Sequence, residues 1–203
     1  MSDSNQEVNE PSEARREALR AKAKEMLKNK VMKPGSYGFI EDQNRVLERK
    51  ENKPPTLVVD CYPLANIQDA STFDMRFKNT LWVPLVGVEG WEPENPAQRD
   101  QCIRTLQCLF PKLIPAITKE KDGYYYKGDK LVGNTAFEDA KTDQLIYCFE
   151  VAERVWAKKL SVASGQFFFA AVTVSEDKTR NWVNPTPNTP DVIATPEELP
   201  KAA

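Results

Sequence analysis

Residues 31–61 read VMKPGSYGFIEDQNRVLERKENKPPTLVVDC, and the sequence pattern changes within this stretch. A charged, helical pattern stops at Pro34 and Gly35, and two strand-like segments, SYGFI and RVLER, follow it. The turn signal KENKPP then leads to another strand-like run, TLVVDCY. The stretch therefore predicts that a β-rich domain begins at residue 34 and opens with strands joined by a hairpin-like connection.

The run FDMRFKNTLWVPL, residues 73–85, alternates between apolar and polar side chains, which predicts a third strand with one wet face. The predicted buried face holds Phe73, Met75, Phe77, Leu81, Val83 and Leu85, and the predicted wet face holds Asp74, Arg76, Lys78, Thr80 and Trp82.

A helical region is predicted next. Asn95 is placed as an N-cap and Pro96 as the first helical residue, and Pro111 and Pro115 end or kink the helix. DGYYYKGDKLVGN, residues 122–134, reads as a loop or small hairpin, and Thr135 with Glu138 predicts a capping box before a second helix. Strand patterns return in GQFFFAAVTV and RNWVN, which end at residues 174 and 184.

The two ends of the chain differ in composition from its middle. Residues 1–10 are polar and acidic, residues 11–33 carry eight basic and three acidic side chains on good helix formers, and residues 184–203 contain five prolines. We therefore predict an acidic tip and a basic helical arm (1–33), one domain (34–184) and a Pro-rich disordered tail (185–203). The basic helix is either a solvated surface helix or an arm that contacts phosphates or a partner.

Composition excludes several classes of function. The chain has no His, and its cysteines, at positions 61, 102, 108 and 148, are scattered, so we expect reduced, buried thiols, no metal or other cofactor, and no enzyme activity. Its longest apolar runs are about ten residues, short of the roughly 20 that span a bilayer, so we expect a soluble protein without a membrane partner. The net charge is −2, so any affinity for nucleic acid must come from local patches.

The order of the predicted elements is three strands, a helical insertion and two strands, which is the order of an OB-fold. This α+β fold is a five-stranded barrel with its helix between strands three and four, although other α+β folds share the order. The loops and wet faces of such a barrel predict a surface where basic side chains follow phosphates and aromatic rings stack on bases. An exposed sheet face also carries such residues merely for solubility. The candidate site residues are Tyr37, Arg45, Arg49, Lys50, Lys53, Arg76, Lys78, Trp82, Tyr125 and Lys127.

Three segments resemble a diverse group of phage-encoded proteins: the KPGSY segment at residues 33–37, the alternating third strand, and GQFFFAAVTV followed by NWVN. Members of that group are described as OB-fold single-stranded-DNA-binding proteins or as proteins of unknown function. The last residues, EELPKAA, lack the acidic tip ending in an aromatic residue through which such proteins recruit partners.

The resemblance implies a non-catalytic protein of phage DNA replication or recombination, located in the host cytoplasm, with single-stranded DNA and replication or recombination proteins as partners. The alternative is a structural or accessory virion protein that makes protein–protein contacts.

Overall fold

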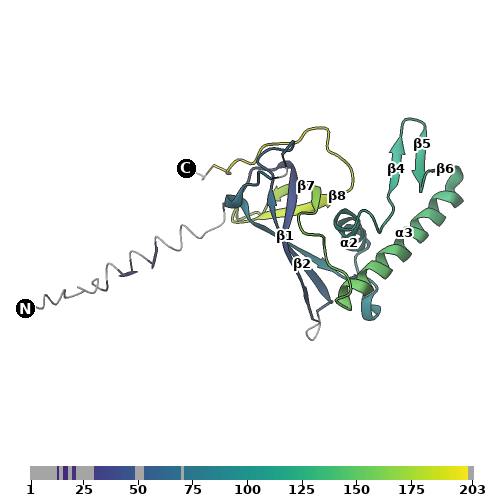
Figure 1. Ribbon diagram of the computed structural model, residues 1–203, viewed down its shortest axis with the longest axis horizontal. Coiled ribbons are helices and arrows are strands. Elements are labelled where there is room, and N and C mark those ends of the chain that lie inside the picture. The colour runs from purple at the N-terminus through teal and green to yellow at the C-terminus, as the bar shows by residue number, and fades with distance from the viewer. Residues whose placement is uncertain are drawn as a thin grey trace, which may run out of the picture.

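The computed structural model describes residues 30–48, 53–69 and 71–200, together with residues 13, 16, 17, 20 and 21. Five antiparallel strands form one sheet in the order β3-β2-β1-β7-β8. They are β1 (Gly35–Leu47), β2 (Thr56–Pro63), β3 (Asn79–Pro84), β7 (Phe167–Val174) and β8 (Asn181–Thr186). The two end strands, β3 and β8, approach each other, so the sheet curls into a nearly closed barrel (Figure 1). The predicted α+β class and five-stranded barrel are confirmed.

Strand β1 joins the two predicted segments SYGFI and RVLER into one strand of 13 residues. Its pairing with β2 shifts register between Glu41 and Gln43, which marks a β-bulge. The Glu41 carboxylate is buried at this point and accepts hydrogen bonds from Asn44 Nδ2 (2.8 Å) and the Gly165 backbone N–H (3.2 Å). These bonds fix the bend that lets β1 pair with β2 along one part and with β7 along the other.

Strand β3 is shorter than predicted, because residues 75–77 form a 3-10 helix, η1 (Met75–Phe77), and the strand begins only at Asn79. Asp74 caps η1 by accepting a hydrogen bond from the Arg76 backbone N–H at 3.1 Å. The alternation over residues 73–78 is therefore not that of a strand. Phe77 is buried as predicted, whereas Phe73 and Met75 are exposed, which corrects their assignment to the core face.

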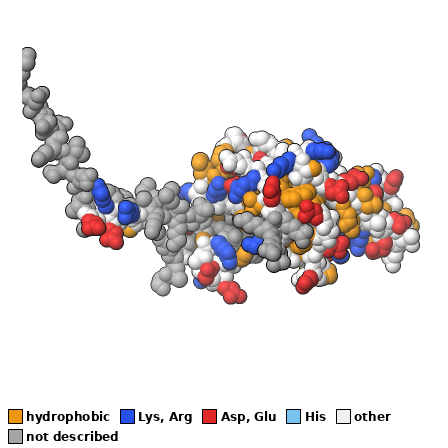
Figure 2. All heavy atoms as spheres, turned by 90° about the horizontal axis from the view of Figure 1, so that it is seen from below, with side chains coloured by type: hydrophobic (Ala, Val, Ile, Leu, Met, Phe, Trp, Pro, Cys, Tyr) orange, Lys and Arg blue, Asp and Glu red, His pale blue; other side chains and the backbone are white. Residues whose placement is uncertain are grey.

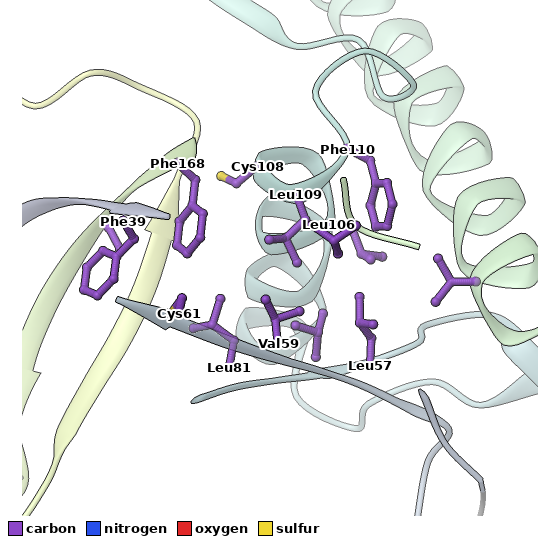
Figure 3. Packing of buried hydrophobic residues seen from close by; sticks show 14 of the residues in the cluster. Phe39, Leu57, Val59, Cys61, Leu81, Leu106, Cys108, Leu109, Phe110 and Phe168 are labelled. Carbon is purple, nitrogen blue, oxygen red and sulfur yellow. The ribbon is translucent and has the colours of Figure 1, made fainter. Parts of the chain in front are cut away.

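Helix α2 (Pro96–Leu109) begins where the sequence predicts, with the Asn95 side chain accepting a hydrogen bond from Ala97 N–H at 2.9 Å. Its apolar side packs on the interior of the barrel, as Figure 3 shows for Leu106 and Leu109 beside Val59 and Leu81. The helix contacts β3, β7 and β8, so it covers the place where the end strands approach each other.

Helix α3 (Gly133–Trp156) begins two residues before Thr135, after Val132, which makes no side-chain cap. The predicted capping box at Thr135 and Glu138 is therefore wrong. A separate three-stranded sheet of β4 (Ile117–Glu120), β5 (Gly123–Tyr126) and β6 (Asp129–Leu131) precedes the helix. Figure 1 shows this small sheet beside the half of α3 that points away from the barrel.

The C-terminal segment follows the barrel instead of forming the tail that its prolines predict. Pro185 lies within β8 and is buried. Beyond β8, Ala194 N–H donates to the Ser36 carbonyl at 2.8 Å, Lys33 N–H donates to the Glu197 carbonyl at 3.0 Å, and the side chains of Lys33 and Glu197 form an ion pair. The predicted acidic tip and most of the basic arm at the other end lie outside the described residues.

Candidate functional site

The side chains of β1, β2 and β3 that point away from the core form the surface that we call the outer face. Because side chains alternate along a strand, Leu57, Val59 and Cys61 enter the core while Val58, Asp60 and Tyr62 point outward from β2. Arg45 of β1 and Trp82 of β3 both pair with Val58, so they flank it on the same face. The outer face comprises Gln43, Arg45, Val58, Asp60, Tyr62, Thr80 and Trp82, with Lys78 at its edge. Val58 and Asp60 are themselves buried among these side chains.

The Asp60 carboxylate lies at the centre of this face and organises its cations. Thr80 Oγ1 donates a hydrogen bond to Asp60 Oδ1 at 2.7 Å. Asp60 Oδ2 lies 3.1 Å from Lys78 Nζ and 3.4 Å from Arg45 Nη1. Because Arg45 from β1, Thr80 from β3 and Lys78 from the residue before β3 share one carboxylate, the two cations are held on the same face as Trp82.

This network shifts the protonation of its members. Burial acts to raise the pKa of Asp60, but the hydrogen bonds from Thr80 and Lys78 and the charges of Lys78 and Arg45 outweigh burial, and the pKa lies below its usual value. The hydrogen bond to Asp60 likewise raises the pKa of Lys78. Both ionised forms are therefore favoured at neutral pH.

Trp82 is the most exposed aromatic group on this face, with 62% of its surface open to solvent. The side chains of Arg45 and Lys78 remain 52% and 37% exposed despite their contact with Asp60. A guanidinium has five donors and an ammonium three, so each cation has capacity for a further anionic acceptor. The face therefore offers a flat stacking surface beside two cations that can contact phosphate.

The charge of the outer face is nevertheless balanced. Asp60 faces both cations, and Asp42, an exposed residue at the bulge of β1, also acts on the charge of Lys78. Figure 2 shows basic and acidic side chains interspersed on the face of the molecule that it presents. Any polyanion bound here is consequently held by few ionic contacts, and stacking has to supply much of its affinity.

The structure thus brings three of the predicted site residues together: Arg45, Lys78 and Trp82. Arg76 lies apart, in η1, where its guanidinium binds both oxygens of Asp74 and its central carbon lies 5.2 Å from the centre of the Phe77 ring. Lys53 is exposed in the connection between β1 and β2. The predicted Arg49 and Lys50 lie outside the described residues.

Tyr37 is part of the core and has no ring surface to offer a ligand. It is 1% exposed, and its hydroxyl donates a hydrogen bond to the Lys33 carbonyl at 2.8 Å. Its hydroxyl instead holds the segment that leads into β1, so Tyr37, a candidate site residue in the sequence, has a structural role here.

Tyr125 and Lys127 belong to the small sheet and not to the outer face. Lys127 Nζ lies 2.6 Å from Asp143 Oδ2 and 3.0 Å from the Tyr147 hydroxyl, both on α3. Tyr125 donates a hydrogen bond of 3.0 Å to Asp122, which also pairs with Lys130. Lys127 thus joins the small sheet to the helix, whereas Tyr125 makes its contact within the small sheet.

Sequence reasoning missed Asp60 and Tyr62 as members of the face. A signal for Asp60 exists, because it is the only charged residue of TLVVDCY and stands at an outward position of the alternation. Its partners come from positions 15 residues earlier and 20 residues later in the chain, and only the pairing of the strands brings them together.

All four cysteines are buried with free thiols, as predicted. Among the described residues, no group of three or more Cys, Asp or Glu is arranged to hold a metal ion. No helix in the same part is long and apolar enough to cross a membrane.

Comparison of the chain with protein-family models, with curated proteins and with solved structures gives no match.

Proposed function

We propose that the protein is a non-catalytic binder of single-stranded DNA and that the outer face is its binding surface. The observation that carries the proposal is that exposed Trp82 shares one sheet face with Arg45 and Lys78. Aromatic rings stack on bases of any sequence and cations contact the backbone, which is the general mode of single-strand binding.

The topology supports the same proposal. The order β3-β2-β1-β7-β8 is compatible with an OB-fold, and in our proposal β7 and β8 are its fourth and fifth strands, with α2 and α3 as the insertion between the third and fourth. OB-folds bind oligonucleotides on the face of their second and third strands, which here are β2 and β3. Because its sequence segments resemble those of phage-encoded proteins, we propose that it acts in DNA replication or recombination of a phage, in the host cytoplasm.

One observation favours the alternative of a structural or accessory virion protein. Asp42 and Asp60 balance the charges of Arg45 and Lys78, and a neutral face with an exposed tryptophan also suits a protein partner. The two functions differ in what the face binds, so one set of binding measurements separates them.

The test is titration of labelled oligothymidine at several salt concentrations. Two phosphate contacts, at Arg45 and Lys78, predict that log affinity falls against log salt with a slope of about 1.4. Trp82→Ala is expected to weaken binding by about 1–3 kcal/mol and leave that slope unchanged. Lys78→Gln is expected to lower the slope by about 0.7.

Matched controls are available on other elements. Trp182 of β8 is 50% exposed and lies beside Arg180, and Lys141 of α3 is an exposed lysine paired with Glu138. Trp182→Ala and Lys141→Gln are expected to bind as the wild type does, and circular dichroism checks that all variants fold. Wild-type affinity weaker than about 100 μM at low salt, below ordinary non-specific binding, rejects DNA in favour of a protein partner.

A further inference from the structure

The outer face continues past Asp60 to the end of β2, where a pair of aromatic rings lies. Tyr62 points outward like Asp60, two residues earlier on the strand. Phe73, from the segment between β2 and η1, stacks on Tyr62 with ring centres 5.4 Å apart and planes inclined by 30°. Phe73 keeps 42% of its surface exposed, so the pair is not enclosed by the fold.

The backbone holds Phe73 in this position. Phe73 forms an isolated antiparallel bridge with Leu64, and the Asp74 N–H donates to the Pro63 carbonyl at 2.9 Å. The segment between Leu64 and Phe73 packs closely on β1. Its Ile67 side chain approaches Gly38 so closely that a Cβ atom added there would lie 2.6 Å from Ile67 Cδ1. Because the backbone at Phe73 and Asp74 is held by these contacts, the Phe73 ring loses little conformational freedom when a ligand stacks on it.

Tyr62 and Trp82 stand on opposite sides of the two cations. Trp82 lies beside Val58, the cations surround Asp60, and Phe73 lies on Tyr62, so the three features follow one another along β2. Lys78 is also within electrostatic reach of the Tyr62 hydroxyl. Val58 and Tyr62 are four residues apart on the strand, a separation of about 13 Å.

This spacing fits a single nucleic-acid strand. Successive nucleotides of a stacked strand are about 3.4 Å apart, so about 13 Å corresponds to roughly four of them. Bases at the two ends would meet the aromatic rings, and phosphates between them would meet Arg45 and Lys78. Bases paired within a duplex expose no ring face to either position.

We propose that Phe73, supported by Tyr62, is a second base-stacking position and that single-stranded nucleic acid runs along β2 from Trp82 to Phe73. The inference rests on the proposed function, because Trp82, Arg45 and Lys78 form the other end of the same path. It assigns a binding role to Phe73, which the alternating sequence pattern predicted to lie in the core.

The test compares two 12-nucleotide ligands: oligothymidine, and a strand of the same length in which every base is absent. Phe73→Ala is expected to weaken binding of oligothymidine roughly 5- to 150-fold, the loss of one stacked base. Its affinity for the abasic strand is expected to equal that of the wild type, because no base is present to stack. Phe73→Leu keeps an apolar contact with Tyr62. It is expected to weaken the affinity for oligothymidine at least threefold and to leave the affinity for the abasic strand unchanged.

The control is Tyr124→Ala, which removes another aromatic residue that is 42% exposed and paired with a ring, here Phe137 of α3. It is expected to bind both ligands as the wild type does. The inference is overturned if Tyr124→Ala loses as much as Phe73→Ala, or if Phe73→Ala weakens both ligands equally, which indicates a structural defect.

Failure of the inference is distinguishable from failure of the proposed function. If Trp82→Ala weakens binding and both Phe73 variants bind oligothymidine normally, the second stacking position is rejected and the function stands. If the wild type does not bind oligothymidine, the function is rejected and the path along β2 with it.

Discussion

The side chain of Asn181 binds both backbone polar groups of Met32. Asn181 Oδ1 accepts a hydrogen bond from Met32 N–H at 2.8 Å, and Asn181 Nδ2 donates one to the Met32 carbonyl at 3.0 Å. Met32 is fully buried, and 149 residues separate the two positions in the chain. One amide at the start of β8 therefore binds the two backbone groups of Met32, while the residues on either side of Met32 pair with the C-terminal segment.

We expect Asn181→Ala to destabilise the protein by about 1–3 kcal/mol, because it leaves both backbone groups of Met32 without their partner. Chemical denaturation measures the free energy of unfolding. Asn184→Ala, at an exposed position of the same strand, is the control and is expected to change it by less than about 0.5 kcal/mol. Equal effects of the two substitutions would show that Asn181 does not fix this segment.

The attachment of the small sheet to α3 makes a second prediction. Asp143→Ala removes the carboxylate that binds Lys127 Nζ and the Tyr126 hydroxyl, the latter at 3.0 Å. The charged partners are about 40% exposed, and exposed ion pairs contribute at most about 1 kcal/mol. We therefore expect tryptic cleavage within residues 117–131 to accelerate up to about fivefold, while the unfolding of the barrel changes little.

Asp139→Ala, an exposed substitution on the same helix, is the control for this cleavage experiment. If it accelerates cleavage as much as Asp143→Ala, the effect comes from the helix and not from the contact with the small sheet.

Local patterns predicted the parts of the fold that depend on neighbouring residues. The β2 and β7 strands, the Asn95 cap and the burial of the cysteines follow from alternation, capping chemistry and apolar surroundings. The strand prediction for residues 73–78 was wrong because a 3-10 turn and a strand both place Phe77 inward. Alternation alone does not distinguish the two structures. The prolines of residues 185–200 predicted a disordered tail. The local pattern could not show that this segment pairs with residues 30–36, which are far away in sequence.

The candidate site was predictable only in part for the same reason. The outward position of Trp82 follows from the strand pattern of β3, whereas Lys78 lies just before that strand, and the position of Arg45 on the same face depends on the bulge in β1 and the register of β2. Tyr37 fits an aromatic–basic pattern equally well in the core and on the surface, and burial alone decides between the two.

The thiols give a third prediction. Thiolate is the reactive form, and burial raises the pKa of Cys102 to about 11 and those of Cys108 and Cys148 to about 12. Burial raises the pKa of Cys61 as well. We expect no thiol of the native protein to react quickly with a disulfide reagent at pH 8, and all four to react in denaturant. One rapidly reacting thiol in the native protein would contradict the burial of that cysteine.

The last prediction concerns pH and Asp60. The pKa of Asp60 in the folded protein lies below its usual value of about 3.9, because hydrogen bonds and cations favour the carboxylate over the opposing effect of burial. The folded state therefore binds this proton less readily than the unfolded state. The resulting stabilisation is present above about pH 4 and is lost as the pH falls through the folded-state pKa.

Asp60→Asn should accordingly lower the free energy of unfolding at pH 7, by about 1–3 kcal/mol for the loss of charge-assisted hydrogen bonds. The difference between wild type and variant should shrink as the pH is lowered from 5 to 3, which denaturation midpoints at several pH values will measure. Asp191→Asn, at an exposed position outside the barrel strands, serves as the control and should give a small difference that does not depend on pH in this way. A difference for Asp60→Asn that stays constant down to pH 3 would mean that the network around Asp60 does not favour its ionised form.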